Sequence, residues 1–195
     1  MRDLIGYPDG WNNLAYCGND IVNAFDLYGC ASMSLRKRSV NNTFGMFSHT
    51  SMHMTVNANE YSQLTSAQKN KFISDGNGNY TSTVSGFETR NSKVPFDTYL
   101  EARYNDPSDT EGKTTHVSDV TSSTNDTLGL IKDYLNEVDK YKNNEKNTDY
   151  DWFPNDQDEA NCNALQGTIL DRIGANTIET DATGFNHRIG GKFFE

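Results

Sequence analysis

The clearest pattern in the chain is a two-residue alternation over residues 48–56, SHTSMHMTV. One face of this stretch carries Met52 and Met54, and the other carries His49 and His53. Such alternation is typical of a β-strand with one buried and one polar face. The stretch therefore predicts a strand on which His49 points consistently to one side.

Five further elements are expected along the chain. They are a weak helix over 60–74, a strand over 80–87 after the turn 75–79, a short strand near 115–120, a helix that begins at Asp126, and a helix that begins at Asn161 and stops at Gly174. Residues 31–47 are expected to form a polar lead-in, residues 88–115 mainly loops, and residues 175–195 a loop with a C-terminal strand or extension. This order favours an α+β fold with a small antiparallel sheet and packed helices.

Length and composition limit the classes of protein that fit. The chain has 195 residues, which is enough for one domain with an attached fragment, and 11% of them are aromatic. Its formal charge of −10 makes it a poor ligand for a nucleic-acid backbone, so no nucleic-acid partner is expected. No apolar run approaches the ~18 residues of a transmembrane segment. The first residues, MRDLIGYPDGW, lack the pattern of a signal peptide.

The chemistry of interest begins with the three cysteines, Cys17, Cys30 and Cys162. They are few and widely spaced, and no C-x-x-C pair is present, which argues against a disulfide framework and a cysteine-rich zinc site. Cys162 follows Asn161, a good helix N-cap, and so falls in the first turn of a helix. Free backbone N–H groups and the helix dipole favour an anion there, and a thiolate is such an anion.

A nucleophilic cysteine needs a base, and His49 is the candidate, because a histidine on a strand with one apolar face points to one side. The alternative reading is an inert Cys162 buried on the apolar face of its helix and a surface His49. The pairing of the two predicts an active site in which Asn161 caps the helix and the helix start supplies an oxyanion hole.

The first thirty residues resemble the C-terminal end of an Rhs repeat-associated core. The matching positions are Asn13-Leu14-Ala15-Tyr16, Asn19, Val22-Asn23, Asp26 and Gly29, with Leu27 where the family has Pro and Cys30 where it has Leu. The resemblance implies that residues 1–30 end the repeat shell and that residues 31–195 form a C-terminal toxin domain. It also implies self-cleavage between Cys30 and Ala31, with Asp26 required for it. The shell and a cognate immunity protein are the implied partners, and a secreted or delivered effector acting in a target cell is the implied setting.

Residues 48–176 resemble the permuted NlpC-type, papain-like cysteine hydrolases, in which a His precedes an Asn-Cys pair that opens a helix. His49 matches that His, and Asn161-Cys162 matches the pair. The resemblance implies a Cys-His hydrolase or acyltransferase of peptidase, amidase or deamidase type, with no cofactor. A third polar residue that orients the His is expected, and His116 and Glu88 are the candidates.

Two other functions compete with this one. His49 and His53 could belong to a metal-dependent toxin of nuclease type, although on a strand they stand about 13 Å apart along the chain. The chain could also be a non-enzymatic module associated with the shell. The Arg36-Lys37-Arg38 cluster is interpreted as part of a solvated linker rather than a nucleic-acid or targeting patch.

Overall fold

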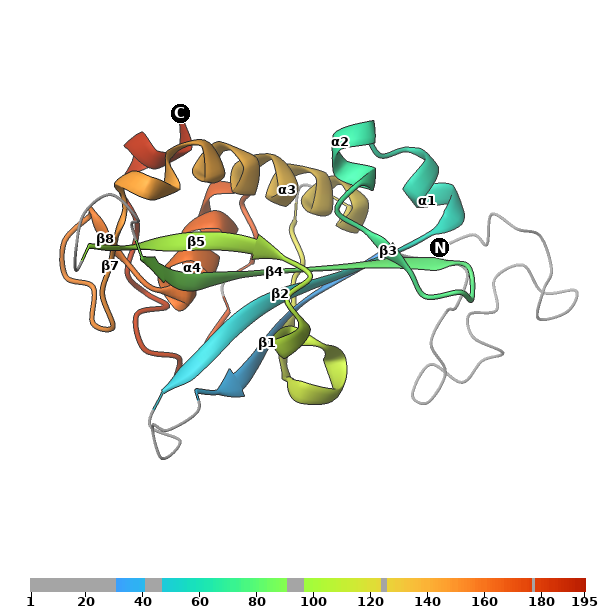
Figure 1. Ribbon diagram of the computed structural model, residues 1–195. Helices are drawn as coiled ribbons and strands as arrows, with labels where there is room; N and C mark the ends of the chain where they lie inside the picture. Colours follow the sequence, from blue (N-terminus) through green and yellow to red (C-terminus); the bar gives the residue numbers. More distant parts are fainter. Residues whose placement is uncertain (1–30, 41–46, 91–96, 124–125, 177) are drawn as a thin grey trace, which may run out of the picture.

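The computed structural model describes residues 31–40, 47–90, 97–123, 126–176 and 178–195 (Figure 1). The proposed junction, with Asp26 and Cys30, lies outside the described residues, so its cleavage stays a prediction. No helix within the described ranges is long and apolar enough to cross a membrane.

The fold is α+β and is built on one curled sheet of eight strands. In the order β6-β1-β2-β4-β5-β7-β8, neighbouring strands pair antiparallel except for the parallel pair β7–β8, and β3 pairs with β4 beside this path. The strands are β1 (Ser32–Ser39), β2 (Ser48–Asn57), β3 (Ile73–Ser74), β4 (Asn79–Arg90), β5 (Thr98–Tyr104), β6 (Thr115–Asp119), β7 (Asp149–Tyr150) and β8 (Glu159–Ala160).

Two longer helices cover one face of this sheet (Figure 1). α3 contacts β1 and β5, and α4 contacts β2 and β4. The helices are α1 (Ala58–Ser62), α2 (Ser66–Lys69), α3 (Thr127–Asn144) and α4 (Cys162–Arg172), and the 3-10 turns are η2 (Pro107–Asp109), η3 (Glu111–Lys113), η4 (Glu145–Asn147) and η5 (Gly191–Phe194). Asp126 caps α3 through Gly129 N–H, as its sequence pattern predicts.

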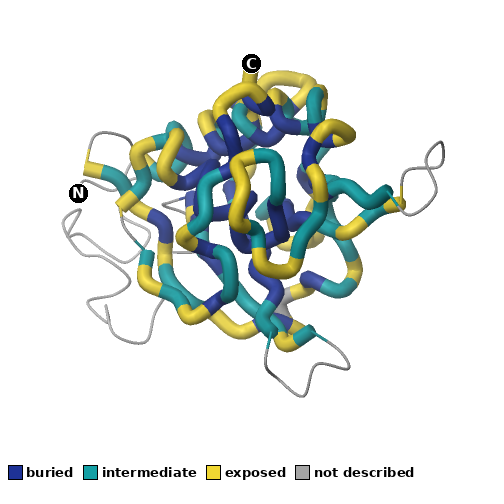
Figure 2. The backbone as a smooth tube through the Cα atoms, turned by 90° about the vertical axis from the view of Figure 1, so that its left-hand side faces the viewer, coloured by how far each residue is buried: buried dark blue, intermediate teal, exposed yellow. Residues whose placement is uncertain are grey.

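The hydrophobic core lies between the sheet and these two helices (Figure 2). Met52 and Met54 of β2 are fully buried there, while His49 and Ser51 belong to the other face of the strand. The Tyr134 hydroxyl donates to Gln166 Oε1 at 2.6 Å, which joins α3 to α4. The Gln166 amide in turn donates to Val84 O at 3.0 Å, so α4 is fixed to the sheet by a buried hydrogen bond.

Two expectations about connecting segments are wrong. Residues 32–39, expected in a polar lead-in, form the strand β1, and Arg36, Lys37 and Arg38 each hold a tertiary partner instead of being solvated. Residues 98–104, expected to be loop, form β5, which pairs with β4. At the C-terminus, where a strand or an extension is expected, the chain ends in the 3-10 turn η5. The sheet is therefore larger than the sequence pattern predicts.

Candidate active site

The site lies where the pairing between β2 and β4 ends. Their pairing runs up to Ser51 and Ser85, and beyond these residues the start of α4 lies against both strands. A Cβ atom on Gly86 would stand 3.1 Å from Cys162 Cα and 2.7 Å from a side-chain carbon of Leu100. Glycine at position 86 therefore lets the helix start approach the sheet. The separation of β2 from β4 lets Cys162, at the start of α4, approach His49, which lies on the face of the sheet opposite the core.

The Asn163 side chain fixes the relative position of β2 and α4. Its Oδ1 accepts from Thr50 N at 3.0 Å and Thr50 Oγ1 at 2.8 Å, and its Nδ2 donates to Ser48 O at 2.8 Å and to Thr183 O at 2.8 Å. Ser48 and Thr50 are the two neighbours of His49 along β2. The same Oδ1 accepts from Cys162 Sγ at 3.4 Å. One buried amide thus positions both the strand that carries His49 and the thiol.

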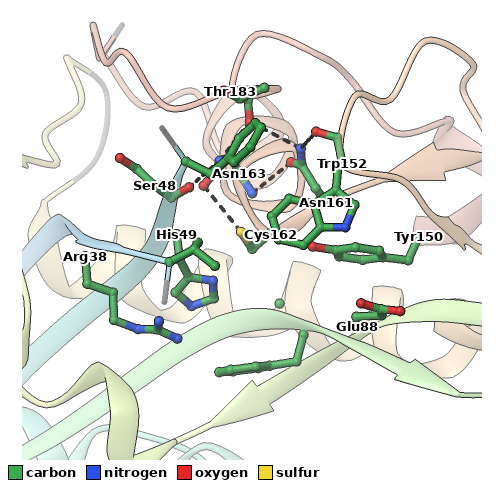
Figure 3. A pocket seen from close by; sticks show the side chains of 14 residues that line it. Arg38, Ser48, His49, Glu88, Tyr150, Trp152, Asn161, Cys162, Asn163 and Thr183 are labelled. Atoms are coloured by element: carbon green, nitrogen blue, oxygen red, sulfur yellow. Dashed lines mark hydrogen bonds between the residues drawn. The ribbon is translucent and has the colours of Figure 1, made fainter. Parts of the chain in front are cut away.

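The His49 ring is buried, with 5% of the residue exposed; it lines the pocket together with Cys162 (Figure 3), and it contacts Asp109. Its Nε2 is 3.3 Å from Asp109 Oδ1 and 3.4 Å from Oδ2, which leaves Nδ1 as the nitrogen for the thiol. Burial alone would lower the pKa of His49. The charge of Cys162, and hydrogen bonds to Asp109 and Cys162, outweigh it and raise this pKa to about 9. With this pKa, the His49 ring carries a second proton at neutral pH.

Asp109 supplies the carboxylate behind the ring. Its side chain is fully buried and accepts from Arg38 Nε at 2.9 Å and from the Ser85 hydroxyl. Burial opposes ionisation, but hydrogen bonds and charge from His49, with hydrogen bonds from Ser85 and Arg38, lower the pKa of Asp109 to about 2. The turn η2 presents this residue, because Asp106 caps it by accepting from Ser108 N at 2.9 Å. Asp109 is thus an anion throughout the physiological pH range.

The helix start offers one backbone donor to the pocket. Asn161 Oδ1 accepts from Asn163 N and Ala164 N, and Asn161 O accepts from Leu165 N. The N–H groups of residues 161–164 have no acceptor within the helix, and the Asn161 side chain satisfies two of them, those of Asn163 and Ala164. The N–H of Cys162 is not satisfied by this cap. It lies next to the sulfur, where an oxyanion would form during attack on a carbonyl group.

A pocket of about 240 Å³ opens in front of Cys162. Its lining includes Phe47, Tyr150 and Trp152, and Tyr150 points its hydroxyl toward the thiol (Figure 3). The pKa of Tyr150 is raised by burial and by the charges of Cys162, Glu88 and Asp151. The hydroxyl is therefore neutral and able to donate a hydrogen bond.

The structure brings together three residues singled out in the sequence: His49, Cys162 and Asn161. Glu88 lies at the pocket but is exposed and does not hold the His49 ring. His116 is an exposed partner of Asp119 at 2.9 Å, on β6. Asp109 contacts Nε2 of the His49 ring, where Glu88 or His116 is expected.

The two histidines of the metal hypothesis lie in different depressions. His49 lines the pocket at Cys162, whereas His53 lines a second depression over β1, β2 and β4 and contacts Ser51 Oγ at 3.2 Å. Within the described ranges, no group of three or more His, Cys, Asp or Glu side chains is arranged to hold a metal ion.

Sequence reasoning missed Asp109, Asn163 and Tyr150. The Asp-Pro-Ser-Asp segment at 106–109 indicates a capped turn, but nothing local indicates that its last carboxylate reaches a strand 60 residues earlier. Asn163 directly follows the Asn161-Cys162 pair. A second amide side chain in the first turn of a helix is the pattern that could have predicted its role.

No family model, no curated protein and no solved structure matches the chain. The function has to be argued from the side-chain geometry described above and from the sequence resemblances.

Replacing Asn163 with Ala is expected to slow the reaction of Cys162 with iodoacetamide by about tenfold or more, because the strand and the thiol lose their common anchor. Loss of its buried hydrogen bonds should also cost about 2–4 kcal/mol of folding free energy. Urea unfolding measures the second effect, and mass spectrometry of the labelled, folded protein measures the first.

Gln166→Ala is the matched control, because Gln166 is an equally buried amide one turn further along α4 with bonds to Tyr134 and Val84. It should lower stability and leave the labelling rate unchanged. Equal labelling rates in Asn163→Ala and the wild-type protein would show that Asn163 does not position the thiol.

Proposed function

We propose that residues 31–195 are a toxin domain that acts as a Cys-His-Asp thiol hydrolase or acyltransferase of peptidase, amidase or deamidase type. One observation carries this proposal: the buried His49 ring contacts the Asp109 carboxylate and lines the same pocket as Cys162, which stands at a helix start. A thiol, an imidazole and an orienting acid form the constellation of a nucleophile, its base and the group that holds the base.

The mechanism follows from this arrangement. His49 carries the proton given up by the Cys162 thiol, and Cys162 Sγ attacks the substrate carbonyl carbon to give a tetrahedral oxyanion. Collapse of this intermediate breaks the bond to the leaving group, which takes the proton from His49, and an acyl-cysteine remains. In a hydrolase, water then attacks with His49 as base and regenerates the thiol. In an acyltransferase, an amine or hydroxyl takes the place of water.

Two donors are placed to stabilise the oxyanion. The Cys162 N–H is left over by the Asn161 cap, and the Tyr150 hydroxyl points into the same pocket and has no hydrogen-bond partner in the described part of the chain (Figure 3). Such donors typically contribute about 10²–10³-fold to the rate of acyl transfer. Asp109 holds the imidazole and stabilises its charged form without taking its proton.

The finer fold class proposed is the permuted papain-like, NlpC-type fold. It is supported by the chain order, with His49 on a strand well before Asn161-Cys162 at a helix start, and by the packing of that helix against the sheet. The third member differs from the candidates expected, since Asp109 comes from the turn η2, whereas Glu88 and His116 lie on β4 and β6.

The proposed boundary at residue 31 has one structural counterpart. Ala31 N donates to Glu60 Oε1 at 2.7 Å, while the other oxygen of Glu60 accepts from Asn57 N at 2.9 Å. Cleavage before Ala31 would turn this amide into an ammonium group that faces a carboxylate, which would stabilise the released domain. The Rhs shell, an immunity protein and delivery to a target cell remain proposals that come from the resemblance of residues 1–30.

The test is growth arrest on expression of residues 31–195 inside cells. The wild-type domain is expected to arrest growth, and Cys162→Ala, produced at the same level, is expected to be harmless. Cys162→Ser reports whether a weaker nucleophile retains some activity. Toxicity of Cys162→Ala equal to that of the wild-type domain would refute the thiol mechanism.

A further inference from the structure

Three aromatic side chains, Phe47, Tyr150 and Trp152, form what we call the aromatic rim of the pocket at Cys162. The ring centroids of Phe47 and Trp152 are 5.4 Å apart, and those of Tyr150 and Trp152 are 6.2 Å apart, both edge to face. Trp152 is 40% exposed. Rings held in a mutual cluster while facing solvent at the mouth of a cavity are available to a ligand.

The floor and walls of the pocket continue this apolar character. Val40 and Phe87 also line it, and the Phe87 ring packs on His49 with centroids 5.1 Å apart. A cavity of about 150 Å³ is large enough for a benzene ring, and this pocket measures about 240 Å³. It therefore has room for one ring-sized group together with the carbonyl group that Cys162 attacks.

The charges at the pocket disfavour an anionic substrate. The cationic side chains that line it, Arg38 and His49, both face the buried carboxylate of Asp109. Glu88 is exposed at the pocket edge, and its charge and that of Asp151 both reach Tyr150. A negatively charged substrate group at the pocket mouth would be repelled by the carboxylates of Glu88 and Asp151. The cations that could pair with it, Arg38 and His49, already face Asp109.

We propose that the aromatic rim is a substrate-specificity site and binds an uncharged aromatic or branched apolar group close to the carbonyl that Cys162 attacks. This inference rests on the proposed function and narrows its substrates to neutral or cationic apolar acyl donors. Trp152 and Phe47 are the specificity-determining residues, because their rings form the two outer walls that such a group would contact.

Affinity alkylation of the full chain tests the rim separately from the chemistry. The probes are iodoacetamide, N-benzyl-iodoacetamide and iodoacetate. In each, the thiolate forms an S–C bond and iodide leaves, so the reaction needs no other reagent. Rates at Cys162 are read by mass spectrometry and divided by the rates of the same probes with free N-acetylcysteine. The normalised rate is expected to be about tenfold or more higher for the benzyl probe than for iodoacetamide, and lowest for iodoacetate.

Trp152→Ala and Phe47→Ala should reduce the benzyl preference to near one, and Trp152→Phe should retain most of it. Phe153→Ala is the matched control: Phe153 is the next residue, is more exposed and packs on Phe47, but does not line the pocket. It should keep the preference. Thermal unfolding verifies that each variant is folded at the assay temperature.

The outcomes separate the two proposals. If iodoacetamide labels Cys162 no faster than free thiol in the folded protein, the proposed function fails. If Cys162 is reactive but shows no benzyl preference, or if Phe153→Ala removes it as fully as Trp152→Ala does, the rim inference is wrong while the thiol chemistry stands.

Discussion

His49→Ala is expected to abolish toxicity and to reduce acyl transfer by about 10²–10⁴-fold, the usual contribution of a general acid–base group. The loss follows because the ring takes the thiol proton and later returns it to the leaving group. Its burial against Asp109, in the pocket that Cys162 also lines, means that no solvent molecule replaces it in the same geometry. Growth arrest and hydrolysis of an activated amide, compared between the variant and the wild-type protein, measure the effect.

His53→Ala is the matched control on the same face of β2. His53 bonds to Ser51 Oγ at 3.2 Å and lies outside the pocket at Cys162. Burial first, and then the charge of Arg36, lower its pKa to about 4, so it is neutral at pH 7. Its removal should leave activity within about twofold of wild type. Loss of activity in His53→Ala but not in His49→Ala would show that the base is wrongly assigned.

Asp109→Asn is expected to move the alkaline limit of activity to lower pH by about one unit or more. In the wild-type protein, His49 carries its proton until the pH rises through about 9, because the charges of Cys162 and Asp109 outweigh burial. Without the carboxylate, burial lowers the pKa of His49 and the proton is lost earlier. Because the pKa of Asp109 is about 2, its charge does not itself titrate across the active range. The pH–rate profile of acyl transfer measures this shift.

Ser85→Ala is the control for that experiment, since it removes one neutral hydrogen bond to Asp109 but leaves the carboxylate and Arg38 in place. Its alkaline limb should stay near the wild-type position. The raised pKa of His49 also makes the stability of the fold depend on pH. The stabilisation that comes from protonating His49 is complete below about pH 6.5 and is lost as the pH rises through about 9. An unchanged alkaline limb in Asp109→Asn would remove Asp109 from the site.

The sequence predicts the half of the site that depends on local signals. A capping amide before an amphipathic stretch marks the start of α4, and strict alternation marks β2, so Cys162 and His49 could each be placed on an element. That these elements meet depends on the parting of β2 from β4 and on Gly86, neither of which has a signature in one sequence.

The parts that were mispredicted depend on distant partners. The sequence of β1 resembles a basic linker because Arg36 and Arg38 alternate only weakly with apolar residues. Yet the Arg36 guanidinium binds Thr114 and the Arg38 guanidinium binds Asp109, each more than 70 positions further along the chain. The candidates for the residue behind His49, Glu88 and His116, lie on the strands β4 and β6. Asp109 comes instead from a turn after β5, a strand that was itself expected to be loop.

The most direct measurement of the central claim is the pKa of the His49 imidazole, followed by NMR titration in the wild-type protein and in Cys162→Ala. Contact between the ring and the thiol predicts a pKa of about 9 in the wild-type protein and a clearly lower one in the variant, because the charge of Cys162 is a main cause of the rise. A pKa near 6.5 that the substitution leaves unchanged would show that the two side chains do not form a catalytic pair.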